Sequence, residues 1–311
     1  MKLALIYGGA GYEREVSILG FRHLFPILSK IYKTVPIFID TSGEFWLRNK
    51  RVFPTYGGFA DEDGDVTRVD SAFPLLHGNL GEDGVVQGAL ELSRIPYVGC
   101  DSRVGAICRD KYVVGAVARE IGIPTLPKRL LSRGERPSAP CFIKPCTLGS
   151  SIGAMAAEND SLVDIAIENA RSVANRVMAE PLLLDKRELE CGYFSAKGKE
   201  LFTKTGEILT KGFYDYDSKY KKGTRTSPVA EVDEWVNERI ADYSSRLVRA
   251  LGVRQICRID FFLSEGEIYF NEINTMPGFT PDSLYHKMLS ASGIEPKEFV
   301  ESLIWDTITN G

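Results

Sequence analysis

The stretch CRIDFFLSEGEIYFNEINTMPGF, residues 257–279, decides the fold that we expect for the C-terminal part of this chain. Two apolar segments, roughly 257–263 and 268–274, flank the polar turn SEGE. Apolar runs of this length that are separated by a short polar turn with glycine are typical of a β-hairpin. The sequence therefore predicts two antiparallel strands that end at a Pro-Gly break.

The polar residues of this hairpin fall on defined faces. Side chains alternate between the faces of a strand, so Arg258 shares a face with Asp260, and Glu272 shares a face with Asn274. Two carboxylates and a carboxamide on one patch suit Mg²⁺, and the arginine is free to hold phosphate or a developing oxyanion. A solvated face with ordinary ion pairs is the alternative, but it does not explain why R-x-D pairs with E-x-N. We therefore favour a metal site.

The N-terminal part has the pattern of a parallel sheet. β-Rich runs at 3–9 and 33–40 flank a helical stretch at about 15–30. A second passage of strand, helix and strand begins at AFPLLHG and closes at IPYVG, residues 95–99. The sequence thus predicts an α/β protein that begins with a Rossmann-like domain.

Two glycine-rich loops resemble nucleotide-binding loops only in part. FIKPCTLGSSIGA, residues 142–154, has small residues after Lys144 that suit an anion or a simple turn, and it is not a Walker A sequence. YGGAGYERE, residues 7–15, has Arg14 where a dinucleotide loop needs its third glycine. Glu13 would repel a pyrophosphate, so it is a candidate ligand for an ammonium group or an ordinary first-turn carboxylate.

Three other segments have a functional and a structural interpretation. His77 follows a strand in LLHGNLGEDG, so it is a pocket donor or an incidental surface residue. Residues 211–224, KGFYDYDSKYKKGT, are a mobile lid or an exposed connection. Glu180 and Glu188 lie around an apolar stretch that fits an adenine slot and equally a charged strand surface.

Composition limits the class of protein. The chain has 311 residues and a net charge of -4, which argues against nucleic acid as the main partner. No apolar run approaches the ~20 residues that span a bilayer, and we expect a cytoplasmic protein without membrane contact. The six cysteines are scattered without a CxxC pair, which argues against zinc and disulfides.

Together these stretches closely resemble the D-alanine–D-alanine ligases of the ATP-grasp superfamily. The resemblance covers almost the whole chain, through GGAGYEREVS, LHGNLGEDGVVQGALELSRIPYVG, DKYVV, IKPCTLGSSIGA, FYDYDSKY and RIDFF…NEINTMPGFTPDSLY. It implies ATP-dependent ligation of two D-alanine molecules through an acylphosphate, for peptidoglycan precursor synthesis. It also implies three domains, which we place at 1–100, 101–182 and 183–311, and a homodimer formed through the N-terminal domain.

The resemblance implies roles for the hairpin and for the ATP site. Asp260, Glu272 and Asn274 would hold two Mg²⁺, or Mn²⁺ in their place, against the ATP phosphates. Arg258 would stabilise the tetrahedral intermediate with the Gly278 backbone. Lys111 and Lys144 would contact the ATP phosphates, and the loop with Ser150 and Ser151 would close over them. Glu180 with the backbone near Leu183 would take the adenine, and Glu188 the ribose.

The resemblance also implies two amino-acid subsites. Glu13 would bind the ammonium of the first D-alanine, with His77 near its carboxylate. Ser283 and Leu284 would hold the carboxylate of the second amino acid. Tyr220 would join Glu13 and Ser150 in a hydrogen-bonded lid triad, and Lys219 would approach the γ-phosphate.

Several positions depart from the family pattern. Gly11 stands where serine is common, Gly115 where a second lysine often follows DK, and His286 where proline is usual. Glu180 and Glu188 are one residue further apart than usual, so the ribose assignment rests on a less regular match. None of these departures affects the metal residues, so the resemblance implies intact catalysis and leaves acceptor specificity open.

The acceptor has several alternatives. Lys219-Tyr220 in FYDYDSKY resembles dipeptide-forming ligases rather than D-lactate ligases, and Leu284 after Ser283 favours D-alanine over D-serine. D-Serine, D-lactate or another D-amino acid are the alternatives within the enzyme class. A non-catalytic sensor on the same fold predicts a damaged metal set, whereas the carboxylates and carboxamide of the hairpin are all present.

Overall fold

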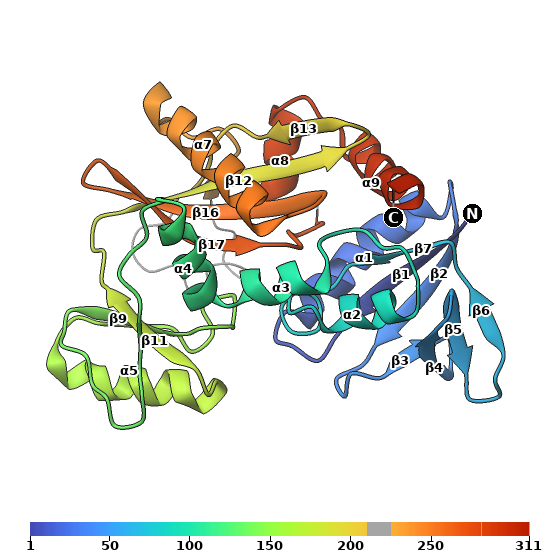
Figure 1. The fold of residues 1–311 in the computed structure, drawn as a ribbon, viewed down its shortest axis with the longest axis horizontal. Coiled ribbons are helices and arrows are strands. Elements are labelled where there is room, and N and C mark those ends of the chain that lie inside the picture. Colours follow the sequence, from blue (N-terminus) through green and yellow to red (C-terminus); the bar gives the residue numbers. More distant parts are fainter. Residues whose placement is uncertain (210–224, 281, 311) are drawn as a thin grey trace.

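The computed structural model describes residues 1–209, 225–280 and 282–310. Within these ranges the chain forms three β-sheets, each covered by helices (Figure 1). The segment that we predicted as a lid, residues 211–224, lies outside the described residues.

The first sheet has seven strands around β1, which runs parallel to β2 and β7. The remaining strands extend β2 as an antiparallel meander that the sequence did not predict. The expected strand at 95–99 is wrong, because this segment forms only an isolated bridge between Tyr97 and Ala72. The strands are β1 (Lys2–Gly8), β2 (Lys33–Ile39), β3 (Phe45–Leu47), β4 (Lys50–Thr55), β5 (Gly58–Asp61), β6 (Val66–Arg68) and β7 (Ser71–Pro74).

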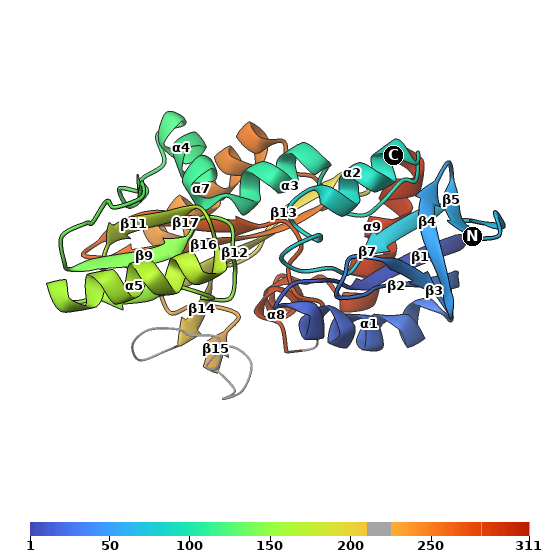
Figure 2. The same cartoon turned by 90° about the horizontal axis from the view of Figure 1, so that it is seen from below.

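Helices α1 (Arg14–Leu28) and α2 (Val85–Leu92) lie on opposite faces of the first sheet (Figure 2). Because side chains alternate along β1, Leu3 and Leu5 join the apolar cluster on the α1 side, and Ala4 joins the cluster on the α2 side. The C-terminal helices also pack into the α1-side cluster; they are α8 (Leu284–Ala291) and α9 (Pro296–Asn310). Both ends of the chain therefore share one core.

The second sheet is small and antiparallel, with the order β10-β9-β11-β8. Helix α5 (Asp160–Val173) covers it through Val163, Ala166 and Ala170. The Asn159 side chain caps α5 by accepting a hydrogen bond from the Ser161 amide. The strands are β8 (Arg129–Leu130), β9 (Cys141–Pro145), β10 (Met155–Ala157) and β11 (Val177–Pro181).

The third sheet contains the predicted hairpin, which is confirmed. Its two strands pair antiparallel, with Arg258 opposite Asn274 and Asp260 opposite Glu272. The register then shifts by one residue at a β-bulge next to Asp260. The strands are β12 (Arg187–Ala196), β13 (Lys199–Phe202), β14 (Gly206–Leu209), β15 (Arg225–Ser227), β16 (Ile256–Ser264) and β17 (Glu267–Asn274).

Three helices pack against the third sheet and build its core: α3 (Ser102–Arg109), α4 (Lys111–Glu120) and α7 (Glu234–Leu251). Val104, Val114 and Leu247 meet Ile259 and Ile273 in this core. Helices α3 and α4 precede the second sheet in the chain but pack with the third. The domain limits at residues 100 and 182 stay predictions.

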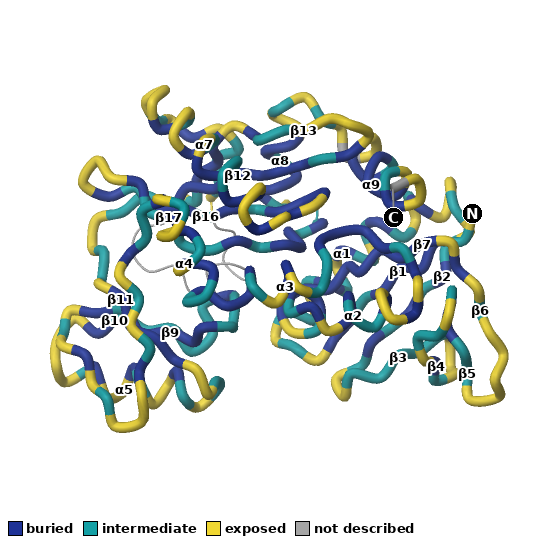
Figure 3. Tube along the Cα trace, in the orientation of Figure 1, coloured by how far each residue is buried: buried dark blue, intermediate teal, exposed yellow. Residues whose placement is uncertain are grey.

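The buried trace follows the central strands of the first and third sheets (Figure 3). All six cysteines are free and buried, as expected for core residues. No helix among the described residues combines the length and the apolar character that a membrane crossing requires.

Ser17 joins the first loop to the sheet, and its removal should weaken the fold. The buried Ser17 hydroxyl donates to Leu75 O at 2.5 Å and accepts the Gly8 amide at 2.9 Å. In Ser17→Ala both backbone groups lose this partner, so we expect the free energy of unfolding to fall by about 1–3 kcal/mol. Urea unfolding checks this against the exposed Ser42→Ala control; an equally small change in both variants would contradict it.

Candidate active site

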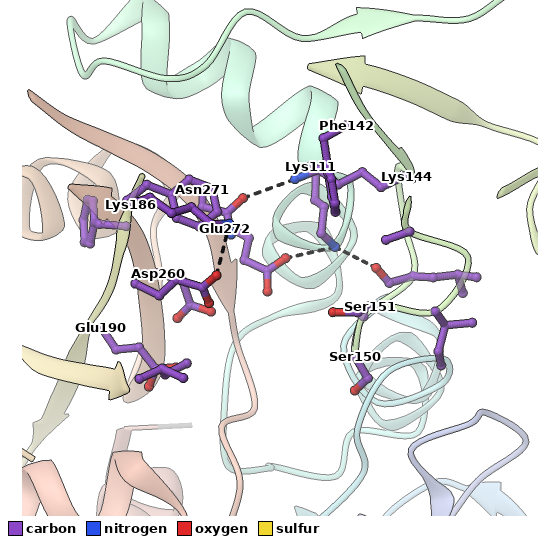
Figure 4. A pocket seen from close by; sticks show the side chains of 18 of the residues that line it. Lys111, Phe142, Lys144, Ser150, Ser151, Lys186, Glu190, Asp260, Asn271 and Glu272 are labelled. Carbon is purple, nitrogen blue, oxygen red and sulfur yellow. Dashed lines mark hydrogen bonds and ion pairs between the residues drawn. The ribbon is translucent and has the colours of Figure 1, made fainter. Parts of the chain in front are cut away.

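A pocket opens between the second and third sheets, where the side chains of both sheets converge (Figure 4). Lys144 on β9 and Lys111 at the start of α4 reach it from one side. Asp260 on β16 and Glu272 on β17 face them from the other. The structure therefore brings together predicted residues that lie far apart in the sequence.

The hairpin patch is held together by its own charges. Arg258 donates to both carboxylate oxygens of Asp260, at 2.8 and 2.7 Å, and lies 3.3 Å from Glu190 Oε1. Asn274 Nδ2 donates to Asp260 Oδ2 at 3.2 Å. The expectation of a free guanidinium is thus wrong for this state. Glu190 was missed because only the pairing of β12 with β16 sets it opposite Asp260.

The two lysines have carboxylate partners. Lys111 Nζ lies 3.1 Å from Glu272 Oε2 and donates to Leu148 O at 2.8 Å. Lys144 Nζ lies 2.7 Å from Glu180 Oε1 and donates to Asn271 Oδ1 at 3.3 Å. These ammonium groups are therefore anchored on both sheets, as buried charges require.

A hollow lined by Glu180, Leu183 and Glu188 continues this pocket. Glu180 Oε2 is buried and has no hydrogen-bond partner among the described residues. Glu188 lies 3.1 Å from Lys186 Nζ. The wall also includes Phe142 and Phe262, so this hollow combines aromatic and apolar surface with one unpaired acceptor.

The glycine-serine loop touches the N-terminal part of the chain. Ser150 Oγ donates to Glu13 Oε1 at 2.7 Å. Ser150 and Ser151 have φ of 52° and 58°, a left-handed conformation that serine rarely adopts. Such strained residues cluster at ligand-binding loops. Two members of the predicted triad thus meet, while Tyr220 and Lys219 lie outside the described residues.

Glu13 belongs to a buried ionic cluster that the sequence did not reveal. Arg109, at the end of α3, lies 3.6 Å from Glu13 Oε2 and 3.2 Å from Glu82 Oε2. His77 donates from Nδ1 to Met276 O at 3.0 Å and is buried, so it is not an incidental surface residue. Burial lowers the pKa of His77. Arg109 belongs to no motif, and its partners Glu13 and Glu82 lie far from it in the sequence.

The predicted residues of the second subsite lie at the start of α8. Ser283 occupies the N-cap position and makes no side-chain capping bond, and a Cβ at Gly278 would lie 3.2 Å from its hydroxyl. The Leu284 side chain is buried in the α1-side core. Because it packs in this core, the Leu284 side chain gives no ground for preferring D-alanine to D-serine.

His286 also points into the core. Its ring centroid lies 5.6 Å from those of Phe279 and Phe299. Burial lowers its pKa to about 4, so the ring is neutral at pH 7. Gly11 lies against Asn79, where a Cβ would be 3.5 Å from the Asn79 Cβ.

Removing the Arg109 guanidinium should leave Glu13 and Glu82 uncompensated. We expect Arg109→Met to lower the free energy of unfolding at pH 8 by about 3 kcal/mol, as for other broken buried ion pairs. Adding Glu82→Gln should restore part of the loss. Urea unfolding measures both effects, with Arg103→Met on the exposed side of α3 as control. A double variant no more stable than Arg109→Met would contradict this charge balance.

Glu82 should make stability depend on pH. Burial raises its pKa from 4.5 to about 7, so the folded protein keeps a proton that the unfolded chain releases near 4.5. Stability from this group is therefore present below pH 4.5 and is lost, by about 3 kcal/mol, as pH rises to 7. Unfolding measured from pH 5 to 8 should show a flatter dependence in Glu82→Gln than in wild type or the exposed Glu62→Gln. The same pH dependence of stability in wild type, Glu82→Gln and Glu62→Gln would contradict the raised pKa of Glu82.

Comparisons with known proteins agree with this geometry. The family models described as D-ala D-ala ligase C-terminus and N-terminus match residues 128–305 and 55–100. A D-alanine–D-alanine ligase A of Brucella suis is 31% identical, covering 100% of this chain and 98% of its own. A D-alanine–D-alanine ligase of Deinococcus radiodurans is 34% identical, covering 97% of each.

Solved structures give the same result. The D-alanyl-alanine synthetase A of Vibrio cholerae matches with a TM-score of 0.89 at 28% identity, covering 100% of this chain and 99% of its own. The VanG D-Ala:D-Ser ligase of Enterococcus faecalis matches with a TM-score of 0.87 at 30% identity, covering 98% of this chain and 99% of its own. The D-alanine–D-alanine ligase of Bacillus anthracis complexed with ATP matches with a TM-score of 0.77 at 25% identity, covering 99% of this chain and 97% of its own. The chain belongs to the D-alanine–D-alanine ligase family of ATP-dependent ligases and has the ATP-grasp fold.

Proposed function

We propose that this protein joins two D-alanine molecules to D-alanyl-D-alanine, with ATP as phosphoryl donor, for peptidoglycan precursor synthesis. The observation that carries the proposal is the meeting of Asp260 and Glu272 with Lys111 and Lys144 in one pocket. Family membership and the names of the relatives support it.

We assign ATP to this pocket and to the hollow that continues it. Lys111 and Lys144 would neutralise the phosphates, and the loop with Ser150 and Ser151 would approach them with backbone N–H groups. The adenosine would lie in the hollow lined by Glu180, Leu183 and Glu188. The unpaired Glu180 Oε2 is suited to the adenine amino group.

The hairpin residues fit Mg²⁺, or Mn²⁺ in its place. Asp260, Glu272 and Asn274 offer the hard oxygen atoms that these ions prefer. Mg²⁺ is usually bound by one or two carboxylates together with substrate phosphates, and Asp260 and Glu272 supply two carboxylates beside the pocket. Two bound ions would offset the negative charge of the triphosphate beside a substrate carboxylate.

The reaction follows from charge and leaving groups. A carboxylate is a poor acyl donor because it would have to expel oxide, so transfer of the γ-phosphoryl group to the first D-alanine supplies phosphate as leaving group. The neutral amine of the second D-alanine then attacks the carbonyl carbon. Arg258 and the Gly278 backbone N–H would stabilise the oxyanion that forms. Phosphate leaves, and the dipeptide remains with ADP.

The ionic cluster is suited to the first amino acid. Glu13 and Glu82 share one guanidinium, so with both ionised the group has a net negative charge that an ammonium can balance. His77 would lie near the carboxylate of this substrate. Ser283 and the backbone amide of Leu284, at the start of α8, would hold the carboxylate of the second amino acid.

We assign Lys219 and Tyr220 to a lid over this site, on the sequence alone. Water would hydrolyse the acylphosphate, so a cover is needed while it exists. Tyr220 would complete the contact that Ser150 makes with Glu13.

Ligation of D-alanine to D-serine is the second candidate. The similarity to the VanG D-Ala:D-Ser ligase supports it, and the Leu284 side chain does not argue against it. A D-lactate acceptor or another D-amino acid would use the same chemistry. A sensor without catalysis is disfavoured by the complete hairpin set.

A panel of acceptors distinguishes these functions. Phosphate release from ATP and Mg²⁺ is measured with D-alanine alone and with D-serine, D-lactate or other D-amino acids added, and the products are weighed by mass spectrometry. We expect rapid release with D-alanine alone and the mass of D-alanyl-D-alanine. A mixed product without turnover of D-alanine alone would replace the acceptor assignment, and silence throughout would overturn the ligase proposal.

Glu272→Gln should abolish phosphate release while preserving the fold. The amide keeps the shape of the side chain but loses the charge that pairs with Lys111 and would bind Mg²⁺. We expect at least ~100-fold slower turnover, in the range seen when essential electrostatic groups are removed. The matched control is Glu267→Gln, an exposed position on the same strand. Near-normal turnover in Glu272→Gln would falsify the hairpin assignment.

We also propose a cytoplasmic homodimer formed through the N-terminal domain. Tyr56, Val85 and Leu92 are exposed large apolar side chains of this domain, which supports a contact surface there. Sedimentation equilibrium of wild type and Leu92→Asp tests the surface. A wild-type protein that stays monomeric at micromolar concentration would contradict it.

A further inference from the structure

Lys128 is a third lysine beside the nucleotide pocket, and no motif or comparison gives it a role. It immediately precedes β8 in the second sheet, yet its ammonium group reaches α4 and β17. Nζ donates to Lys111 O at 3.1 Å and to Asn271 O at 3.2 Å. One side chain thus connects the segment before β8 with α4 and β17, and the last two border the pocket.

The two carbonyls belong to residues that orient the pocket. The Lys111 side chain contacts Glu272, and the Asn271 side chain accepts from Lys144. Asn271 is the bulged residue of the hairpin, because the register passes from Asp260 opposite Glu272 to Phe261 opposite Phe270. A bulge re-aims a side chain but leaves its backbone without a regular partner in the ladder. Lys128 supplies a partner for that backbone carbonyl.

Gly115 provides the room for this lysine. It lies inside helix α4, where glycine is less favourable than alanine, and its φ is not positive. A Cβ at this position would lie 2.9 Å from Lys128 Nζ and 3.1 Å from its Cδ. The absence of a side chain at Gly115 is therefore explained by the position of Lys128 and not by backbone conformation.

We propose that Lys128 is a positioning residue of the nucleotide site: it fixes the Asn271 bulge and the first turn of α4, and so aims Lys144 and Lys111 at the phosphates. Gly115 is the steric condition for this arrangement. The inference rests on the nucleotide pocket of the proposed function, but not on the identity of the amino acids that are joined.

Binding of ADP with Mg²⁺, measured by calorimetry, tests the proposal without any amino acid present. Lys128→Met keeps the length and apolar stem of the side chain and removes the hydrogen-bond donors. We expect it to weaken ADP binding about tenfold. Gly115→Ala should cause a smaller loss in the same direction, because the added Cβ would push the flexible Lys128 side chain away from its two carbonyl partners. The matched control is Gly88→Ala in α2, where a Cβ would meet only Ser102 Cβ at 3.9 Å, and ADP binding should stay unchanged.

The double variant decides whether the two residues act together. Because the loss in Gly115→Ala passes through Lys128, Gly115→Ala should not weaken ADP binding further in the Lys128→Met background. If Gly115→Ala weakened ADP binding equally in wild type and in Lys128→Met, the dependence of its effect on Lys128 would be overturned. ADP affinity within twofold of wild type in Lys128→Met, with only a lower unfolding midpoint, would show a merely structural lysine and overturn the proposal.

The same measurement separates this inference from the proposed reaction. A wild type that binds ADP and shows the expected losses, yet does not ligate D-alanine, would refute the reaction and support the role of Lys128. A wild type that binds no ADP would overturn both the nucleotide pocket and the role of Lys128.

Discussion

The ammonium group of Lys111 joins the Glu272 carboxylate on β17 to the Leu148 carbonyl in the glycine-serine loop, and the site is arranged around this bridge. Charges that leave water need partners, so the lysines and carboxylates of the pocket neutralise one another. In the proposed complex the phosphates of ATP and Mg²⁺ would take over these contacts.

The N-terminal part contributes a second group of buried charges. Arg109 lies between Glu13 and Glu82, and Ser150 connects Glu13 to the loop that borders the nucleotide pocket. Burial makes such a group costly, and strongly shifted ionisable groups cluster at functional sites. If Glu13 binds the first D-alanine as proposed, its contact with Ser150 would connect that substrate to the glycine-serine loop.

Much of the hairpin patch could be predicted because strand alternation fixes which side chains share a face. The hairpin, its turn and the faces of Asp260 and Glu272 followed from period-two patterning. The meander β3–β6 and the contacts of Arg109 could not be predicted, since short strands have weak patterns and Arg109 pairs with residues distant in sequence. The binding of Arg258 to Asp260 and Glu190 depends on the pairing of β12 with β16, which is also a long-range fact.

The proposed reaction requires that the γ-phosphoryl group of ATP activates a substrate carboxylate. D-Alanine labelled with ¹⁸O in both carboxylate oxygen atoms tests it directly, with the released phosphate weighed by mass spectrometry. In an acylphosphate, one of these oxygen atoms joins the carbonyl carbon to phosphorus and leaves with phosphate when the amine attacks the carbonyl carbon. We therefore expect one phosphate with a single ¹⁸O atom for each dipeptide formed. Unlabelled phosphate released in step with the dipeptide would contradict this account.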